Sequence, residues 1–302
     1  MYNLSLRQLK TIFILGETKR LVQAAEILSL TPPAVTIQLK LAEEQIGLKL
    51  FHRTQKGLKL TDAGIEVVSS ARKIFGHLND MKSKLDSINN SKTGSVKIGV
   101  VATAKYFAHK IIAGFIKSNP EIKVSINVNS REIILNEMET YNIDLAITGT
   151  IPSGFDLITK PFGKHPIIMI CKPGYYLANK KNVLKKELIE ESFLTREPGS
   201  GTYNLLQSFI EEIKLETEPS MTLSGTNETV KQAVMSGLGI ALISKHCCIN
   251  ELQNNLLKEI DVQNLPIIKE WYITKLKNRT LTPSSKLLFD FIEENGDSFL
   301  PN

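Results

Sequence analysis

Two short amphipathic helices are predicted at the start of the chain. In the first, apolar residues recur every three or four positions behind a serine of the kind that caps helix N-termini, namely Ser5 followed by Leu6, Leu9 and Phe13. This spacing predicts a helix that ends near Gly16. The run "LVQAAEILSL" predicts a second helix, whose apolar face consists of Val22, Ala25 and Leu28. A tight turn over residues 29–30 follows it.

Two consecutive prolines mark the start of a third helix. Proline lacks a backbone N–H and its fixed φ suits the first helical turn, so Pro32 and Pro33 after the candidate cap Thr31 define where this helix begins. We expect it to run to about Ile46 and to end at Gly47. Its buried face has apolar residues at helical spacing, at Val35, Leu39, Ala42 and Ile46. A second, mixed face consists of Pro33, Thr36, Ile37 and Lys40.

The next stretch, "LKLFHRTQKGLKLT", alternates on both sides of a polar turn and predicts a β-hairpin. The alternating apolar positions are Leu48, Leu50, Leu58 and Leu60. The tip is basic and carries His52, Arg53, Lys56 and Lys59. A basic hairpin that follows two helices and a tight turn is typical of a wing that contacts phosphates.

A long helix with a narrow apolar seam is predicted from about Ala63 to Asn89, with a length of ~40 Å at 1.5 Å per residue. The seam has heptad spacing and consists of Val67, Ala71, Ile74, Leu78, Met81, Leu85 and Ile88. A narrow seam needs a partner, which is either the core of the same chain or a second copy of the helix. We favour a dimer-forming linker helix, and "NNSKTGS" after it predicts a hinge.

From residue 95 onward, strand-like and helix-like runs alternate. "SVKIGVV" predicts a strand, "AKYFAHKIIAGFIKSNP" a helix and "EIKVSINVN" a second strand, and "PIIMICK", "GIALIS" and "KEWYITK" predict strands further along. Alternation of this kind indicates a parallel sheet covered by helices, which makes this part a doubly wound α/β body.

Charge divides the chain into two parts. Residues 1–92 contain 14 lysines and arginines against 8 acidic residues, whereas residues 93–302 contain 23 of each, so the net charge of +6 lies in the first third. A basic folded segment attached to a neutral body indicates a polyanion partner for that segment. The length of 302 residues suits about two domains of roughly 100–200 residues each.

Several classes of protein are disfavoured by the sequence. No apolar run of ~18 residues is present and the N-terminus lacks the apolar core of a signal peptide, so we expect a cytoplasmic protein without a membrane partner. The three cysteines, Cys171, Cys247 and Cys248, suit neither a disulfide framework nor a metal site, and we expect buried, inert thiols and no metal or cofactor. None of the histidines has a triad context, so no catalytic residue and no enzyme activity is predicted.

Two short helices joined by a tight turn form the arrangement of a helix-turn-helix. In this interpretation the mixed face of the third helix enters a DNA major groove, where Thr36 and Gln38 hydrogen-bond base edges and Ile37 packs on a thymine methyl. An ordinary solvated helix face stays open as the alternative. The predicted DNA contacts are Thr31, Pro32, Pro33, Thr36, Ile37, Gln38, Lys40, Arg53 and Lys56.

The stretch "AAEILSLTPPAVTIQLKLAEEQIGLKLFHRTQKGLKLTDAG" resembles the N-terminal DNA-binding signature of the LysR-type transcriptional regulators, and the match runs over residues 6–64. The chain has Pro32 where many members carry Gln and Ile37 where many carry a basic residue, which removes polar base contacts. The form "TPPAV" resembles the members that control carbon-fixation (RuBisCO) operons.

This resemblance implies a domain plan. A winged helix-turn-helix, mainly α, would occupy residues 1–60 and a coiled-coil dimerisation helix residues 61–90. An α/β effector domain of the two-lobed periplasmic-binding type would occupy residues 95–302, with lobe I at 95–162 and 268–302 and lobe II at 163–267. The cleft between the lobes would bind an effector.

Two strand-to-helix junctions, "VVATAKYF" and "TREPGSGTYN", are candidates to line that cleft, although a plain loop is the alternative for the second. Ligands bind at the carboxyl ends of strands in open sheets, and helix N-termini attract anions. The predicted effector contacts are Thr103, Ala104, Lys105, Thr148, Arg196, Gly199, Ser200, Gly201, Thr202 and Asn227.

The sequence therefore predicts a ligand-responsive regulator that binds double-stranded operator DNA as a homodimer or a dimer of dimers. We expect a small anionic effector, either a carboxylate or a phosphorylated metabolite, and control of carbon-fixation genes. RNA polymerase is a candidate further partner. Two alternatives stay open, namely a regulator of another pathway that senses an amino acid or aromatic acid, and a structural DNA-binding protein without a ligand.

Overall fold

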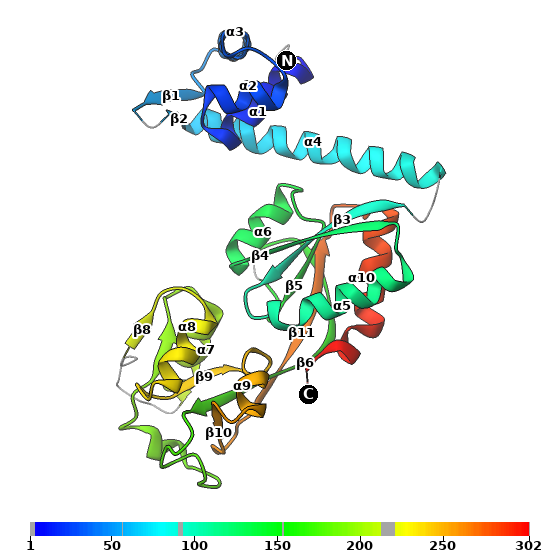
Figure 1. Cartoon of the computed structure of the whole chain (residues 1–302). Coiled ribbons are helices and arrows are strands. Elements are labelled where there is room, and N and C mark those ends of the chain that lie inside the picture. The colour runs from blue at the N-terminus through cyan, green and yellow to red at the C-terminus, as the bar shows by residue number, and fades with distance from the viewer. Residues whose placement is uncertain (1–3, 56, 90–92, 153, 213–220, 302) are drawn as a thin grey trace. The chain divides into compact units, whose positions relative to one another are not determined.

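The computed structural model describes residues 4–55, 57–89, 93–152, 154–212 and 221–301 (Figure 1). The chain separates into two compact units. The first comprises Met1–Leu85 with Glu139–Asn142, and the second Asp86–Met138 with Ile143–Asn302.

The first unit begins with three helices, α1 (Leu6–Thr18), α2 (Leu21–Leu28) and α3 (Pro32–Ile46). The predicted caps are confirmed. Ser5 forms a reciprocal capping box at the start of α1, and the Thr31 hydroxyl accepts a hydrogen bond from the backbone N–H of Ala34 at the start of α3. Each helix ends at a residue in the left-handed conformation, namely Lys19, Ser29 and Gly47. The first helix ends at Thr18, close to the expected end near Gly16.

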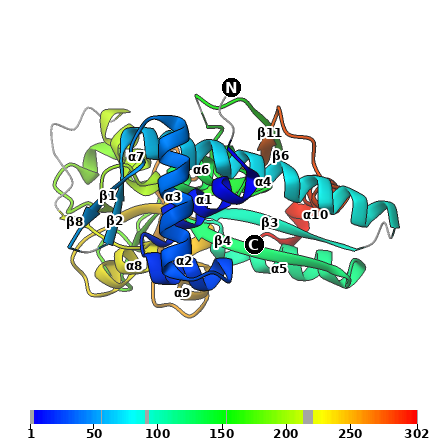
Figure 2. The ribbon, with the colours of Figure 1, turned by 90° about the horizontal axis from the view of Figure 1, so that it is seen from above.

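The helices pack around one apolar core, in which α3 lies across α1 (Figure 2). The predicted inner face of α3 is confirmed, since Val35 and Ala42 are buried and the other two members are half-buried. The expected face of α2 was wrong at one position, because Val22 is 59% exposed and Ala24 is buried in its place. Alanines on the inner face let α2 approach its neighbours closely.

The predicted hairpin is present as β1 (Phe51–Thr54) and β2 (Gly57–Leu60), which pair antiparallel. The buried carboxylate of Glu43 joins α3 to this hairpin, because it accepts hydrogen bonds from the backbone N–H groups of Leu50, at 2.9 Å, and Phe51, at 3.4 Å. Gly64 packs against the same turn. A Cβ at Gly64 would lie 2.0 Å from the Leu50 carbonyl oxygen, so only glycine fits there.

A 28-residue helix, α4 (Asp62–Asn89), follows the hairpin and matches the predicted linker helix closely. Its first turns belong to the core of the first unit, where Ala71 is buried and Val67 is half-buried. Arg72 forms an ion pair with Glu17 of α1. These contacts attach the start of α4 rigidly to the helical core.

The second unit is built on a seven-stranded mixed sheet. Its strands are β3 (Gly94–Val101), β4 (Ile122–Asn129), β5 (Leu145–Thr148), β6 (Leu157–Cys171), β9 (Ala241–Ser244), β10 (Lys258–Ile260) and β11 (Ile267–Leu276). Their order is β10-β6-β11-β5-β3-β4, with β9 also paired to β6. A separate parallel pair consists of β7 (Leu194–Arg196) and β8 (Met221–Leu223).

One part of the sheet, containing β3, β4 and β5, is covered on both faces. Alternate residues of β3, including Val96 and Ile98, face α5 (Lys105–Ser118) and α10 (Pro283–Asn295) in one core. The opposite face is covered by α6 (Arg131–Glu139), whose Ile134 is buried. Figure 2 shows α5 running along β3 and β4.

The other part of the sheet has two further cores, one on each face of β6. Ile167 and Met169 face one core with α7 (Gly201–Glu212), whereas Ile168 faces a second core with α8 (Asn227–Met235). The long strands β6 and β11 pair along their length and pass from the first part of the unit to the second (Figure 1).

The expectation of a parallel sheet is correct for β3, β4 and β5 but wrong for β6, β9, β10 and β11, which pair antiparallel. The reason is that β6 and β11 are adjacent and carry the chain between the two parts in opposite directions. Two short elements were not predicted, α9 (Ile249–Gln253) and β10, because so few residues give no clear period. Among the described residues, no helix is long and apolar enough to span a membrane.

Candidate DNA-binding face and effector site

The predicted outer face of α3 is exposed to solvent. Pro33, Ile37 and Lys40 are all exposed, and the Ile37 side chain, which is apolar, is 59% exposed. Thr36 is half-buried, and its hydroxyl donates a hydrogen bond to the Pro32 carbonyl at 2.9 Å. The oxygen of this hydroxyl can still accept a hydrogen bond from a base edge. Thr31 and Pro32 are exposed at the N-terminal end of the same helix.

Gln38 differs from the other residues of this face. Its side-chain amide contacts the Thr11 hydroxyl of α1 at 2.5 Å. Gln38 therefore helps to hold α3 against α1, and one of its polar atoms is used inside the unit. Thr11 is itself completely buried.

The hairpin presents a basic edge. His52, Arg53 and Thr54 are exposed along β1, and Lys59, also exposed, pairs opposite His52 on β2. The predicted contact Lys56 lies outside the described residues. Arg20 was not predicted, but it is exposed at the N-cap of α2 and approaches the hairpin near Gly57. The sequence signal for Arg20 was its position as a cation directly before the second predicted helix.

The predicted dimerisation seam separates into two parts. Val67 and Ala71 pack within the first unit, as described above. The next four members are exposed in the single chain and consist of Ile74, Leu78, Met81 and Leu85, between 36% and 53% exposed. The side chain of Ile88 lies outside the described residues. A stripe of exposed apolar side chains at heptad spacing is typical of a helix that pairs with another chain.

In the second unit, three predicted effector residues form one hydrogen-bonded chain. The Thr202 hydroxyl donates to Asn227 Oδ1 at 3.1 Å, and Asn227 Nδ2 donates to Thr103 Oγ1 at 3.4 Å. Thr103 follows β3, while Thr202 and Asn227 lie in the first turns of α7 and α8. The chain therefore links the part of the unit that contains β3 with the part that contains α7 and α8. We call these three residues the junction cluster.

Several residues beside the junction cluster already make contacts within the fold. The Ser200 hydroxyl caps α7 by accepting the backbone N–H of Tyr203 at 3.1 Å, and Gly199 has a left-handed φ of 86° in the turn before it. Arg196 forms an ion pair with Glu197, so its charge is balanced locally. Lys105 Nζ lies 5.1 Å from the centroid of the Tyr106 ring. Ala104 is completely buried and Gly201 is exposed.

Several buried polar atoms lack a hydrogen-bond partner within the described part of the chain. They are Thr148 Oγ1, Thr195 Oγ1, Ser244 Oγ, Tyr106 Oη, Arg196 Nε, both ring nitrogens of His165 and, in the first unit, Arg72 Nε. Thr148 and Ser244 end β5 and β9, and Thr195 lies in the three-residue strand β7. An unpaired buried polar atom costs about 1–3 kcal/mol, so a polar ligand or ordered water is expected at such atoms.

Two buried histidines lie next to the same region. The rings of His165 and Trp271 stack with centroids 3.8 Å apart, and Trp271 Nε1 donates to His246 Nδ1 at 3.0 Å. Burial, aided by the neighbouring His246, lowers the pKa of His165 to about 3, and burial lowers the pKa of His246 to about 4. Both rings are therefore neutral at pH 7.

The cysteines are buried free thiols, as predicted. Burial raises the pKa of Cys171 to about 11 and that of Cys247 to about 12. Thiols in this state are poor nucleophiles.

Two family descriptions match the chain. "Bacterial regulatory helix-turn-helix protein, lysR family" matches residues 6–65, and "LysR substrate binding domain" matches residues 89–297. The chain belongs to the LysR family. It is a ligand-responsive transcriptional regulator, with a DNA-binding helix-turn-helix in its first unit and a substrate binding domain in its second.

Named LysR-family relatives extend along almost the whole chain. The "HTH-type transcriptional regulator CbbR" of Xanthobacter flavus is 36% identical over 298 residues, which is 98% of this chain and 90% of that protein. The "RuBisCO operon transcriptional regulator" of Allochromatium vinosum is 33% identical over 96% of each chain. The solved CcmR regulatory domain of Synechocystis PCC6803, in complex with 2-PG, is 31% identical with a TM-score of 0.63, and the match covers 67% of this chain and 97% of that one.

Sequence reasoning missed part of the candidate effector site of this LysR-family protein. Tyr106, Thr195 and Ser244 were not predicted, although their hydroxyls share the buried, unpartnered state of Thr148. A signal existed for two of them, since Thr195 in "FLTR" and Ser244 in "ALIS" are hydroxyl residues in or at the end of apolar strands, as Thr148 is in "LAIT".

Proposed function

We propose that this LysR-family regulator controls carbon-fixation genes and senses a small anion at the junction cluster. The observation that carries the choice of genes is the 33% identity, over 96% of each chain, to a protein named as a RuBisCO operon transcriptional regulator. The "TPPAV" motif at the start of α3 supports the same assignment. The named relatives are transcriptional regulators, and we assign the chain no catalytic activity.

Helix geometry supports an anionic effector. The first turns of α7 and α8 are linked through the hydrogen bond between Thr202 and Asn227. Helix N-termini carry partial positive charge and unpaired N–H groups, so two of them at one place favour an anion over a neutral ligand. The related CcmR domain with bound 2-PG supports a small anion as well. An amino acid or aromatic acid is the second candidate class, because its carboxylate suits the same helix termini.

The effector contacts in this proposal are the hydroxyls of Thr103, Ser200 and Thr202, together with Asn227 and the backbone around Gly199 and Gly201. Thr148 and Arg196 complete the set, and the unpartnered Arg196 Nε and Thr148 Oγ1 support their inclusion. Ala104 and Lys105 form the start of α5 beside Thr103.

A thermal-shift titration of the full-length protein with 2-PG tests this site. A ligand at 100 times its Kd stabilises the folded state by about 2.7 kcal/mol, so a rise in melting temperature that depends on concentration is expected. Thr103→Val and Ser200→Ala should each reduce that rise. Ser208→Ala, which removes an exposed hydroxyl further along α7, is the matched control and should leave it unchanged. If the rise in melting temperature in both site variants equals that in wild type, the ligand binds elsewhere.

For DNA we propose a dimer formed through α4 that binds a pseudo-palindromic operator in the cytoplasm. The outer face of α3 enters the major groove, and Arg53, with Lys56 and the neighbouring basic residues, contacts phosphates. Half-sites would be separated by about one helical turn or a multiple of it. RNA polymerase is a further partner if the protein acts as an activator.

In vitro selection from a randomised duplex library tests the operator prediction. Enrichment of two inverted half-sites with a fixed separation is the expected outcome. Enrichment of single half-sites, or of no sequence, contradicts dimeric operator binding.

A further inference from the structure

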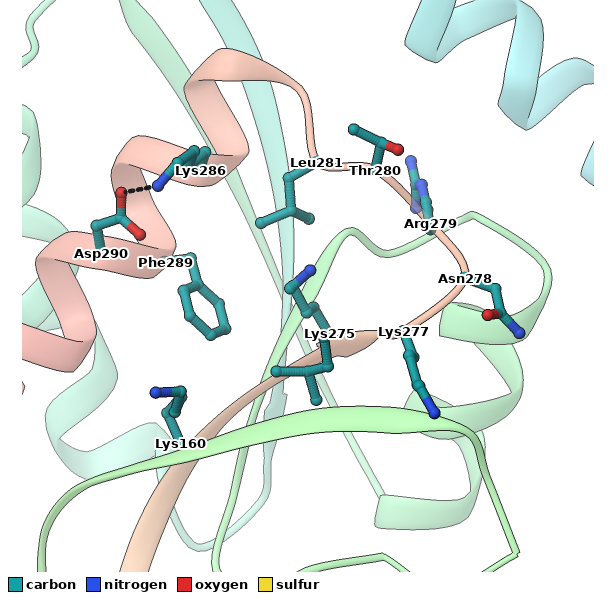
Figure 3. Close-up of a pocket in the computed structure, with 11 residues that line it drawn as sticks. Lys160, Lys275, Lys277, Asn278, Arg279, Thr280, Leu281, Lys286, Phe289 and Asp290 are labelled. Carbon is teal, nitrogen blue, oxygen red and sulfur yellow. Dashed lines mark hydrogen bonds and ion pairs between the residues drawn. The ribbon is translucent and has the colours of Figure 1, made fainter.

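A basic cavity lies in the second unit at a distance from the junction cluster. It has a volume of about 500 Å³ and is enclosed by the start of β6, the end of β11 with the loop after it, and α10 (Figure 3). Sites for small molecules have volumes of about 300–1,000 Å³, so this cavity is of suitable size for a metabolite.

The cavity and the junction cluster lie at opposite ends of the sheet. Thr148 and Thr103 mark the carboxyl ends of β5 and β3. The cavity lies beyond the amino end of β5, where Arg279 binds the Asp144 carboxylate at 2.6 Å and the Ile143 carbonyl at 3.0 Å. The length of β5 thus separates the two places, and one small ligand does not occupy both.

The lining of the cavity contains more cations than carboxylates, although Arg279 is paired with Asp144. It contains five cations and one carboxylate, namely Lys160, Lys275, Lys277, Arg279 and Lys286 with Asp290. The Asp290 carboxylate is already neutralised by Lys286 Nζ at 2.5 Å. Lys160 and Lys277 pair with carboxylates outside the lining, at 3.1 and 3.5 Å. Exposed pairs of this kind are weak, so an anion in the cavity can draw these lysines toward itself.

Lys275 is the residue that most clearly needs a ligand. It is half-buried, and among the described residues no carboxylate lies within ion-pair distance of it. Figure 3 shows its ammonium group near the middle of the drawn side chains, next to Leu281 in this view, whereas Lys160 and Lys286 lie toward one side. An ammonium group held in this way has three donors and no anion to receive them.

The wall beside Lys275 is apolar. Ile158 and Leu281 are half-buried, and Phe289 is 6% exposed with its ring beside the cavity (Figure 3). Cations along one side and hydrocarbon along the other suit a ligand with an anionic end and a carbon body.

We propose that this cavity is a second binding site for a small anion with two or more negative charges, such as a phosphorylated or polycarboxylate metabolite. Lys275 is its central contact, and Lys277 and Lys160 turn inward to complete it. The site is separate from the junction cluster and does not depend on the function proposed for that cluster.

Calorimetric titration of the full-length protein with inorganic pyrophosphate at constant ionic strength tests this site. Wild type should bind, and Lys275→Gln combined with Lys277→Gln should weaken binding at least about tenfold, because two charged hydrogen-bond donors are lost. The single variant Lys275→Arg, which keeps the charge, should retain most of the wild-type affinity. Lys110→Gln combined with Lys117→Gln, two lysines on α5, is the matched control and should bind as wild type.

Three outcomes overturn the proposal. They are the absence of pyrophosphate binding to wild type, unchanged affinity in the Lys275 and Lys277 double variant, and equal loss of affinity in Ser200→Ala, which would place the anion at the junction cluster. Operator binding measured on the same variants reports on the regulator function separately, since none of these lysines lies in the first unit.

Discussion

Single polar side chains in the first unit divide between those that hold the fold together and those that face solvent. Glu43 and Gln38 are used inside the unit, since the first binds the backbone at the start of the hairpin and the second contacts Thr11. Lys40 and Arg53 are exposed. Substitutions in the first group should therefore affect stability, and substitutions in the second should affect DNA binding.

Arg53→Ala should weaken binding to every duplex sequence, because Arg53 is expected to contact a phosphate. Loss of one phosphate contact lowers the slope of log affinity against log salt by about one. Fluorescence anisotropy over a series of salt concentrations measures this slope. A variant with altered sequence preference and an unchanged slope would show that the wing assignment is wrong.

Thr36→Ala should alter sequence preference and leave the salt dependence of binding unchanged, which is the opposite of the effect expected for Arg53→Ala. The Thr36 oxygen is expected to accept a hydrogen bond from one base, so its loss should reduce discrimination at one operator position by about 1–3 kcal/mol and leave the salt slope unchanged. Competition between duplexes that differ at single positions measures the effect. Uniform weakening at all positions would instead indicate a phosphate contact or damage to α3.

His165 makes the stability of the second unit depend on pH. Its folded pKa of about 3 lies below the unfolded value of about 6.5, so the unfolded state binds more protons between these values and stability is lost as pH falls below about 6.5. Between pH 7 and pH 5 this loss amounts to about 2 kcal/mol. His246, with a folded pKa of about 4, acts in the same direction.

His165→Phe should therefore reduce the loss of unfolding free energy between pH 7 and pH 5 by about 2 kcal/mol, while a flat ring keeps the stack on Trp271. Chemical denaturation at the two pH values measures the difference. The same loss in the variant and in wild type would show that His165 is not buried in its neutral form.

At the scale of secondary structure, elements with local signals were predictable and elements with tertiary causes were not. The start of α3 follows from two prolines and a capping threonine, and α4 follows from its heptad spacing. The antiparallel pairing of β6 with β11 could not be predicted, because the pattern of apolar residues along a strand does not give the direction of its neighbour. The buried face of α2 was misjudged at one position. Val22 and Ala24 are both apolar, so apolar character alone did not show which of them is buried.

The exposed half of α4 gives a test at this scale. Leu78→Lys places a charge in the middle of the seam, where a partner helix would bury it without a counterion, so the dimer should dissociate. Light scattering should show a fall in assembly mass. Asn79→Lys adds the same charge at the next, exposed position and is the control. An unchanged mass in Leu78→Lys would exclude this seam as the main dimer contact.

For the whole molecule, the sequence shows which part binds DNA, but it predicts only part of the candidate effector site. The excess positive charge of residues 1–92 distinguishes the DNA-binding unit from the neutral remainder of the chain. Thr103, Thr202 and Asn227 were predictable because each lies at a strand-to-helix junction or helix start. Tyr106, Thr195 and Ser244 were missed, because the sequence does not show which hydroxyls are buried without a hydrogen-bond partner.

The central claim is that an anion bound at the junction cluster alters how this LysR-family protein binds its operator. The direct measurement is operator affinity of the full-length protein with and without 2-PG, at constant ionic strength, in wild type and in Thr103→Val. We predict that 2-PG changes the operator affinity or the footprint of wild type and has a much smaller effect on Thr103→Val. Without 2-PG, the operator affinity of Thr103→Val should match that of wild type. Operator binding that is identical with and without 2-PG, or an equal response in Thr103→Val, would contradict the claim.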